Sequence, residues 1–406
     1  MSDETKPLLR PLDFQPVYYQ GEQMWFLRDP LQLSDQQLFM PAAMGPLLSL
    51  LNGKRTVAEI HDQFCTLVGE TLDLQITTNA IDNLDKAFLL ENKRSELAKQ
   101  ALLNEYRSQP YRPPALAGQS YPSDPQELTK HLQNYTSGKV VSNWHGRGIV
   151  SPHIDYNRGG KVYSQVWRSA EAAILDAELV VILGTDHYGG LGTITLTKQS
   201  YTTPYGILPN DTRLVDQLAT ALGPETAFAD EINHRKEHSV ELSAVWLHHI
   251  FHQAGREPCS MVPILVGSFQ HFLVNGDQPS NDEHFLAFLE VLKKETADRR
   301  VLTVASVDLA HVGPAFGDLF IMDQPRREKL ASQDLNLIAA AITGDAESWY
   351  SQIAAVDDRN RICGFAPTYL MLKHLGQTNG TQIAYAQCSA DDQDASLVSI
   401  CGLLID

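Results

Sequence analysis

The sequence has no uninterrupted apolar run that approaches the ~18 residues needed for a membrane-spanning helix. The N-terminal residues MSDETKPLLRPL carry charges of both signs and lack the apolar segment of a secretory signal. We therefore expect a cytoplasmic protein without a membrane partner.

Cysteines and basic residues are also scarce. The five cysteines are widely spaced and form no Cys-x-x-Cys pair, which argues against a disulfide framework and a zinc ribbon. The chain has 32 Lys and Arg residues against 49 Asp and Glu residues, so its formal net charge is -17. Because non-specific binding to nucleic acid needs clustered cations, we expect no nucleic-acid partner.

The first hundred or so residues differ in pattern from the remainder. Residues 1–20 form a proline-containing, extended lead-in, and residues 21–95 read as a compact, mostly helical unit that begins near MWFLR. Thr56 and Glu59 have the spacing of a capping box at the start of a helix over 57–67. Residues 96–110 intersperse acidic and basic side chains, which predicts a solvated helical linker.

From residue 111 onward, strand-like and helix-like segments alternate. Strand-like runs lie near residues 148–151, 178–183, 192–197, 261–266, 300–307 and 396–404. Helical patterns lie near residues 162–175, 211–222, 237–252, 281–295, 326–342 and 365–375. The alternation predicts an α/β fold with a mainly parallel or mixed sheet covered by helices on both faces.

Three strand-like runs end in polar turns that carry both histidine and aspartate. These turns contain His153 and Asp155 in GIVSPHIDYNRGG, Asp186 and His187 in VVILGTDHYGG, and Asp308 and His311 in VLTVASVDLAH. Each histidine alone is equally explained as a hydrogen-bonded turn or core residue. Together they predict a metal site or an acid–base pocket, because ligands bind where the carboxyl ends of such strands meet.

Cys363 opens the helix-like stretch CGFAPTYL. A helix N-terminus favours the thiolate and lowers the pKa of a cysteine, so we predict a metal ligand or a nucleophile at this position. A buried cysteine with a purely structural role is the alternative.

The stretch HRKEHSVEL offers a competing site. His234, Glu237 and His238 form an H-x-x-E-H motif, the order found in inverted zinc proteases. On a helix the two imidazoles would share one face and Glu237 would act as general base. The polar run NHRK instead predicts a loop up to about Glu237, which disfavours the protease. The histidines of HHIFH at 248–252 are predicted to lie on a surface face.

The segment 111–406 resembles the Memo family, also named AmmeMemoRadiSam system protein B, which shares its fold with class III extradiol ring-cleaving dioxygenases. The resemblance rests on RPPALAGQSYP, SPHIDYNRGG, LGTDHYGG, TPYGILPND, EHSVELSAVWL, VPILVG, SVDLAH and CGFAP, in that order. Residues 21–95 resemble the PqqD-like winged-helix domains through LLSLLNGKRTVAEIHDQF and LDKAFLLEN. Such domains bind a peptide along an edge strand, which implies the same for this unit. The alternative is a small helical appendage that only packs on the larger domain.

The resemblance to the Memo family implies a metal site at His153, His187 and Cys363. In the related dioxygenases two histidines and a carboxylate hold ferrous iron. Here a thiol replaces the carboxylate, so iron is expected, with copper or zinc as alternatives. The resemblance also implies catalytic, proton-moving roles for four pocket residues: Glu237, His238, Asp308 and His311. Where many family members have other residues, this chain has Asp155 and Asp186, whose role is left open between orienting the imidazoles and changing the metal preference.

Three functions remain open at this point. The first is an iron-dependent oxidoreductase acting on a peptide or small molecule, with a radical SAM enzyme and an AMMECR-type protein of the same system as partners. The second is a non-catalytic module that binds a peptide or stores a metal. The third is a zinc-dependent hydrolase that uses the H-x-x-E-H stretch.

Overall fold

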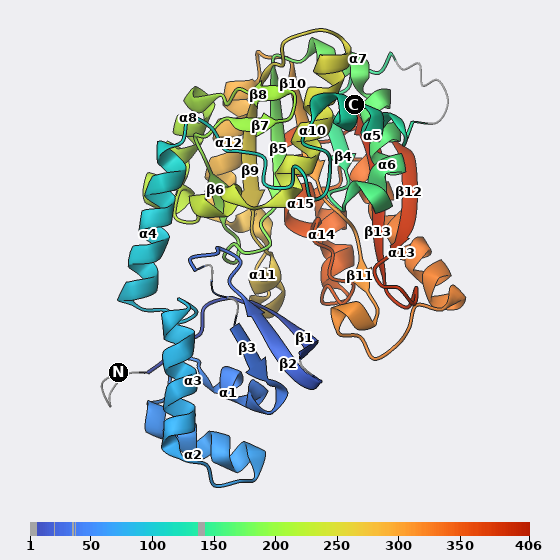
Figure 1. Ribbon diagram of the computed structural model, residues 1–406. Coiled ribbons are helices and arrows are strands. Elements are labelled where there is room, and N and C mark those ends of the chain that lie inside the picture. Colours follow the sequence, from blue (N-terminus) through green and yellow to red (C-terminus); the bar gives the residue numbers. More distant parts are fainter. Residues whose placement is uncertain (1–5, 20, 35, 37, 137–142) are drawn as a thin grey trace. The chain divides into compact units, whose positions relative to one another are not determined.

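The computed structural model describes residues 6–19, 21–34, 36, 38–136 and 143–406. The chain divides into two compact units, Met1–Gln109 and Pro110–Asp406 (Figure 1). Within the described ranges, no helix has both the length and the apolar content required to cross a membrane.

The N-terminal unit begins with a three-stranded antiparallel sheet in the order β1-β2-β3. Its strands are β1 (Asp13–Tyr19), β2 (Glu22–Arg28) and β3 (Leu38–Pro41). Two sequence expectations are corrected here: residues 13–19 belong to the sheet, and MWFLR is a strand rather than a helix. Phe14, Val17, Tyr18 and Tyr19 favour a strand in β1, and Trp25 and Phe26 favour one in β2. Pairing of the two strands outweighs the weak helical spacing.

Helices follow the sheet in this unit. They are α1 (Gly45–Leu50), α2 (Val57–Val68), α3 (Leu74–Lys86) and α4 (Lys93–Ser108), and α4 covers most of the predicted linker. The capping box of α2 is confirmed, with Glu59 N–H donating to Thr56 Oγ1 at 3.3 Å and Thr56 N–H donating to Glu59 Oε2 at 2.8 Å. Ile60, Phe64 and Ile81 are buried between these elements.

The larger unit is built on an eight-stranded mixed sheet in the order β11-β13-β4-β10-β5-β9-β6, with β12 paired to β13. The strands are β4 (Gly148–Ser151), β5 (Leu179–Thr185), β6 (Ile194–Leu196), β9 (Ser260–Val266), β10 (Val301–Ser306), β11 (His311–Val312), β12 (Gly380–Ser389) and β13 (Leu397–Ile405). The neighbours β4, β10, β5 and β9 run parallel, whereas β13 and β6 are antiparallel to the strands beside them. The predicted mixed sheet is therefore confirmed.

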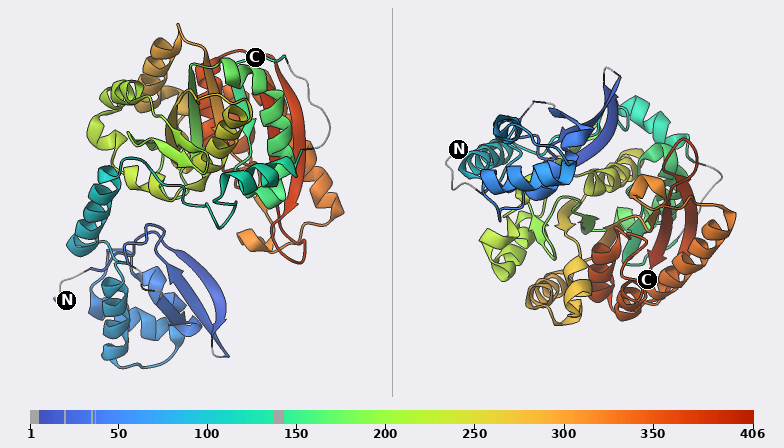
Figure 2. Two further views of the ribbon diagram at one scale, coloured as in Figure 1. Left: turned by 45° about the horizontal axis from the view of Figure 1, so that its top comes forward. Right: turned by 90° about the horizontal axis from the view of Figure 1, so that it is seen from below.

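Helices cover both faces of this sheet, as Figure 2 shows. One face packs against α5 (Pro125–Gln133), α6 (Tyr156–Ser169), α7 (Glu171–Asp176) and α10 (His238–Gln253). The other packs against α8 (Thr212–Leu222), α12 (Glu283–Thr296), α13 (Gln324–Ile342), α14 (Ala346–Ala354) and α15 (Phe365–Leu375). Shorter elements are β7 (Tyr201–Thr203), β8 (Gly206–Leu208), α9 (Pro224–Ala227) and α11 (Gln270–Asn275).

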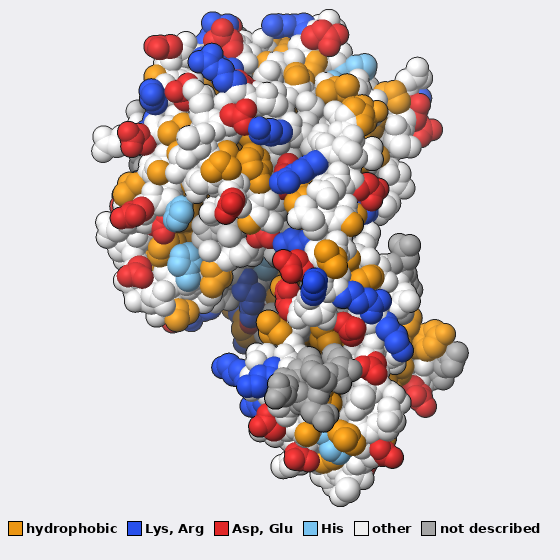
Figure 3. Space-filling model, turned by 90° about the vertical axis from the view of Figure 1, so that its left-hand side faces the viewer, with side chains coloured by type: hydrophobic (Ala, Val, Ile, Leu, Met, Phe, Trp, Pro, Cys, Tyr) orange, Lys and Arg blue, Asp and Glu red, His pale blue; other side chains and the backbone are white. Residues whose placement is uncertain are grey.

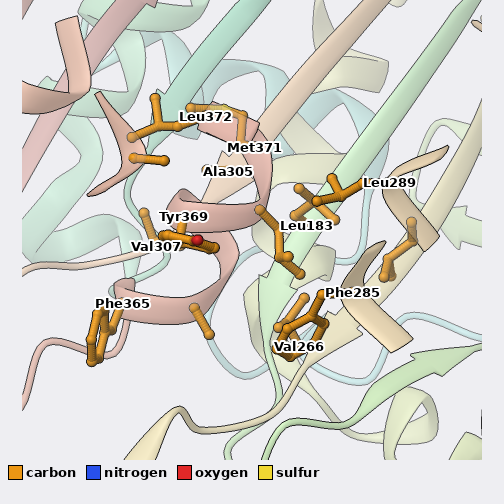
Figure 4. Close-up of a cluster of buried hydrophobic side chains, with 14 of the residues drawn as sticks. Leu183, Val266, Phe285, Leu289, Ala305, Val307, Phe365, Tyr369, Met371 and Leu372 are labelled. Atoms are coloured by element: carbon orange, nitrogen blue, oxygen red, sulfur yellow. The ribbon is translucent and has the colours of Figure 1, made fainter. Parts of the chain in front are cut away.

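Helix α15 is anchored directly on the central strands. In Figure 4 its Tyr369 and Leu372 lie in the same buried cluster as Leu183 of β5 and Ala305 of β10. This packing fixes the start of α15, immediately after Cys363, at the carboxyl edge of the sheet. Figure 3 shows one face of the molecule, on which acidic and basic side chains are interspersed rather than gathered by sign.

Candidate metal centre

The strands that carry the predicted ligands are neighbours in the sheet. Ser306 of β10 pairs with Ser151 of β4 on one side and with Gly184 of β5 on the other. The three parallel strands thus end at the same level, and the residues that follow them emerge together. His153, Asp308 and His187 meet at this edge, as the sequence predicts.

His153 is buried and held at both its backbone and its ring. Asp308 Oδ1 accepts the His153 N–H at 2.9 Å, and the ring Nδ1 lies 2.9 Å from the Ser306 carbonyl oxygen. Because a carbonyl can only accept, Nδ1 carries the proton and Nε2 keeps its lone pair. That Nε2 is 3.2 Å from Cys363 Sγ.

Glu237 orients two further imidazoles. Its carboxylate lies 3.1 Å from His187 Nδ1 and 3.0 Å from His238 Nδ1, and it also accepts the His187 N–H at 3.0 Å. Both Nδ1 atoms therefore donate to Glu237, which leaves the Nε2 atom of each ring as the nitrogen available to a metal. Burial opposes the charge of Glu237, but His187 and His238 hold its pKa well below the usual range.

Two overlapping groups of potential metal ligands result. His153, His187 and His238 form one group, and His153, Asp308 and Cys363 form the other; the ligand atoms within each lie within 4.8 Å of one another. The His187 and His238 side chains are 30% and 39% exposed, whereas His153 is 2% exposed. The centre is thus closed on the His153 side and open on the side of the other two rings.

Cys363 lies just before α15, but the pKa of its thiol is not lowered as the sequence predicted. Burial raises the pKa of Cys363, although the neighbouring His187 acts in the opposite direction. Desolvation therefore outweighs the helix N-terminus on which the predicted low pKa rested. The following residue, Gly364, donates its N–H to the Asp308 carbonyl at 3.0 Å. A Cβ at this position would lie 2.8 Å from that oxygen, which explains the glycine.

The segment before Cys363 has an unusual backbone. Asp357, Asp358 and Arg361 all have positive φ, at 50°, 45° and 50°. Arg361 pairs with Asp318, its Nη2 donating to Oδ1 at 2.8 Å. Such strained positions persist only when their surroundings fix them, and here they set the approach of Cys363 to the histidines.

His311 contacts this same segment rather than the metal-ligand groups. Its N–H donates to the Asn360 carbonyl at 2.7 Å, and its ring Nδ1 lies 3.1 Å from the Arg361 carbonyl oxygen. Asp308, by contrast, belongs to the centre, where burial raises its pKa to about 6. Of the four residues predicted to move protons, the structure therefore brings Glu237, His238 and Asp308 together and leaves His311 as a support.

The two additional aspartates do not orient imidazoles. Asp155 caps α6, where it accepts the Arg158 N–H at 3.2 Å and pairs with the Arg158 guanidinium. Asp186 accepts from Asn233 Nδ2 at 3.1 Å and from the Tyr188 N–H at 3.2 Å. Glu237 holds the position at His187 that an orienting role for Asp186 would require.

The zinc-protease arrangement is absent from this part of the chain. His234 lies in a 3-10 turn ahead of α10, and its ring nitrogens contact the Tyr201 hydroxyl at 2.8 Å and the Thr195 carbonyl at 3.0 Å. With both nitrogens engaged in the core, His234 cannot share a metal with His238.

The prediction of a surface face at 248–252 is wrong for two of its three histidines. His248 and His249 are 5% and 6% exposed and bind the hydroxyls of Thr203 and Tyr205. The β7–β8 hairpin supplies both hydroxyls and covers this part of α10.

The sequence did not reveal that Glu237 supports the rings of both His187 and His238. It indicated only a proton-moving role for Glu237. Its adjacency to His238 was visible, but its contact with His187 spans 50 positions and depends on α10 packing against β5. The Ser306 carbonyl, which sets the tautomer of His153, left no sequence signal because any residue supplies that group.

Comparison with known proteins agrees with this architecture. The model of the family described as Memo-like protein matches residues 112–404. A MEMO1 family protein of Aquifex aeolicus is 27% identical over 383 residues, covering 94% of each chain, so the match includes the N-terminal unit. A second MEMO1 family protein of that organism is 30% identical over 292 residues, covering 71% of this chain and 96% of its own. One from Methanosarcina barkeri is 28% identical over 292 residues, with the same two coverages.

Proposed function

The chain belongs to the Memo-like protein family, and from this we propose that its larger unit is a mononuclear metal-dependent oxidoreductase. The observation that carries the proposal is the convergence of three imidazole rings, each with an acceptor at its Nδ1, beside a cysteine thiol. An acid–base pocket alone would not need three rings with the same tautomer.

The donor set suits a transition metal. Imidazole nitrogens and a thiolate favour iron, copper(I) or zinc over magnesium or calcium, which take oxygen ligands. We propose iron, with His153, His187 and Cys363 as ligands and His238 as a fourth donor near the open side. Asp308 is close enough to Cys363 and His153 to share protons with them as ligands exchange.

A bound iron ion would supply one-electron chemistry and dioxygen activation. The protein's own part is to hold the rings and manage protons. Glu237 keeps the His187 and His238 rings in one tautomer, and Ser306 does so for His153. His238, the most exposed of the three rings, is placed to exchange a proton with a substrate at the open side.

A cavity of about 260 Å³ adjoins His187 and Cys363 and is the proposed substrate pocket. Its apolar wall includes Val266, Phe269 and Phe365. The volume is just below the ~300 Å³ of the smallest common ligand sites, so it fits a small molecule or one side chain of a peptide.

The N-terminal unit is proposed to recruit a peptide, in keeping with its resemblance to PqqD-like domains. Strand β1 is an edge of the small sheet, and it carries Phe14, Tyr18 and Tyr19 with 60%, 81% and 48% exposure. An extended peptide can add to such an edge by main-chain hydrogen bonds. We further propose a cytoplasmic setting, with a radical SAM enzyme and an AMMECR-type protein as partners.

Metal analysis of anaerobically purified protein tests the centre. We expect iron in the wild type and its loss in His153→Ala, His187→Ala and Cys363→Ala. The matched control is His284→Ala, which removes an exposed histidine of α12. Unchanged iron in all three ligand variants would refute the assignment.

Oxygen uptake then separates an enzyme from a binding module. Iron-loaded wild type should consume oxygen with a candidate peptide or small molecule, and Cys363→Ala should not. Stoichiometric iron without uptake for any candidate would favour the storage or binding module.

A further inference from the structure

A second cavity, of about 470 Å³, lies at the opposite end of the larger unit's sheet from the metal centre. Its wall includes the residues that precede β4, the first residues of β10, and the last turns of α7, α12 and α15. This is the end marked C in Figure 1, since Arg147 in the wall contacts the Asp406 carbonyl. The volume falls within the ~300–1,000 Å³ range of small-molecule sites.

Two polar side chains of the wall have a buried atom without a hydrogen-bond partner among the described residues. They are Thr303, whose residue is 0% exposed and whose Oγ1 is unpaired, and His374, whose Nδ1 is unpaired. Thr303 lies two positions before Ala305 in β10, so both side chains point to the same face of the sheet, the face covered by α12 and α15. His374 comes from α15 on that face. Unpaired buried polar atoms are rare in proteins and call for a partner.

Two cations stand close to this pair. Burial, and then Lys293 and Arg147, lower the pKa of His374 to about 4, so both positive charges act on the ring. Arg147 donates only weakly, to the carbonyls of Leu375 at 3.4 Å and Asp406 at 3.5 Å. Lys293 is exposed and has no ion pair with any described residue.

The other arginines of the wall differ, because each is neutralised by a carboxylate. Arg299 pairs with Asp211 at 2.7 Å, and Arg300 pairs with Asp176 at 3.3 Å. Arg147 and Lys293 are thus left to meet a ligand, together with the His374 ring and the Thr303 hydroxyl.

A structural role for these cations at helix C-termini explains part of the arrangement. Three helices end here, and their carbonyl ends attract positive charge. That role accounts for the bond from Arg300 Nε to the Asp176 carbonyl. It does not account for Thr303 and His374, whose buried atoms remain unpaired.

We propose that this cavity is a second ligand site, which binds a small molecule carrying a phosphate group. Arg147 and Lys293 pair with the phosphate oxygens, while the Thr303 hydroxyl and the His374 ring donate from the inner wall. A phosphate has enough acceptor oxygens for all four donors. The remaining volume accommodates the organic part of a phosphate monoester.

Isothermal titration calorimetry of the full chain tests the site, with inorganic phosphate and glycerol phosphate as the probes. We expect both to bind, and the monoester to bind more tightly. Lys293→Gln and Arg147→Gln should each weaken binding by about tenfold, the size of one charge-assisted hydrogen bond. Thr303→Val should also weaken binding, and it should raise the melting temperature of the ligand-free chain, because it removes an unpaired hydroxyl.

The matched control is Lys329→Gln, the same loss of charge at an exposed lysine of α13 away from the cavity. It should leave phosphate affinity unchanged, and the iron content of every variant should equal that of the wild type. The proposal is overturned if neither phosphate compound binds the wild type, or if Lys329→Gln weakens binding as much as Lys293→Gln does.

Discussion

Replacing Glu237 by glutamine should weaken metal binding although Glu237 need not touch the metal. The carboxylate accepts four N–H groups, from the two imidazole Nδ1 atoms and from the backbones of His187 and Ser239, at 3.0 to 3.1 Å. Glutamine keeps one acceptor oxygen and turns an NH2 group toward some of these donors. One ring therefore loses its acceptor, and both lose the negative charge that strengthens their Nε2 atoms as ligands.

The expected loss follows from this count. Removing an outer partner of a metal-binding histidine typically costs ~10- to 100-fold in metal affinity. This corresponds to about 1.4 to 2.7 kcal/mol. Because Glu237 supports two rings at once, we expect a value at the upper end. Glu237 also caps α10, but the glutamine side-chain oxygen can still accept the Ser239 N–H, so the helix should persist.

Competition with a chromogenic chelator under anaerobic conditions measures the effect, with zinc as a redox-inert second metal. Glu257→Gln, at an exposed position, is the matched control and should bind both metals like the wild type. Circular dichroism of the metal-free variants shows whether the fold is intact. If folded Glu237→Gln binds iron and zinc as tightly as the wild type, our account of the centre's preorganisation is wrong.

Three further predictions address residues whose roles the structure changed. Asp155→Ala should keep its iron and lose about 1 kcal/mol of unfolding free energy in urea, as expected for a lost helix cap, whereas loss of iron would return Asp155 to the metal centre. His234→Phe should likewise retain its metal but lose ~1–3 kcal/mol, because it leaves two buried partners unpaired; zinc lost only in this variant would revive the protease hypothesis. Burial lowers the pKa of His248 and His249 to about 4. Below about pH 6.5 the unfolded chain therefore takes up protons that the folded chain does not, and stability falls between pH 6.5 and 4. From pH 8 to pH 5 each ring should cost about 2 kcal/mol, and urea unfolding of His249→Gln should show a correspondingly smaller drop.

The ends of the central strands were predictable because their hydrophobic runs are short and end in polar turns. Parallel strands end at the same edge of a sheet, so His153 and His187 were expected at one edge; the strand order, which places β10 between β4 and β5, was not predicted. The same alternation of segments predicted a mainly parallel or mixed sheet, and the antiparallel pairs of β13 and β6 make it mixed. By contrast, β12 is only half-buried along most of its length, and so carries little hydrophobic signal. Helix α14 was also not predicted, although its buried residues Ala346, Trp349, Tyr350 and Ile353 have helical spacing.

Contacts between distant segments account for what the sequence could not reveal. The thiol of Cys363 stands at a helix start, as its sequence context indicates, but the depth of its burial decides its pKa. Helix α10 is buried from Ser239 to Phe251, so it offers no solvent-exposed face at His248 and His249. Their partners come from the β7–β8 hairpin, whose place on α10 is a tertiary property.

The contact between His153 and Cys363 joins residues that are 210 positions apart. The metal centre therefore does not exist in any fragment of the larger unit, and it forms only after β4, β10 and β5 have aligned and α15 has docked. Contacts of such long sequence separation form late in folding. A metal that binds the finished centre and not the unfolded chain stabilises the native state in proportion to its affinity. Loading of the proposed metal would thus report completed folding, and chelation should expose newly made chains to proteolysis before it affects any other property.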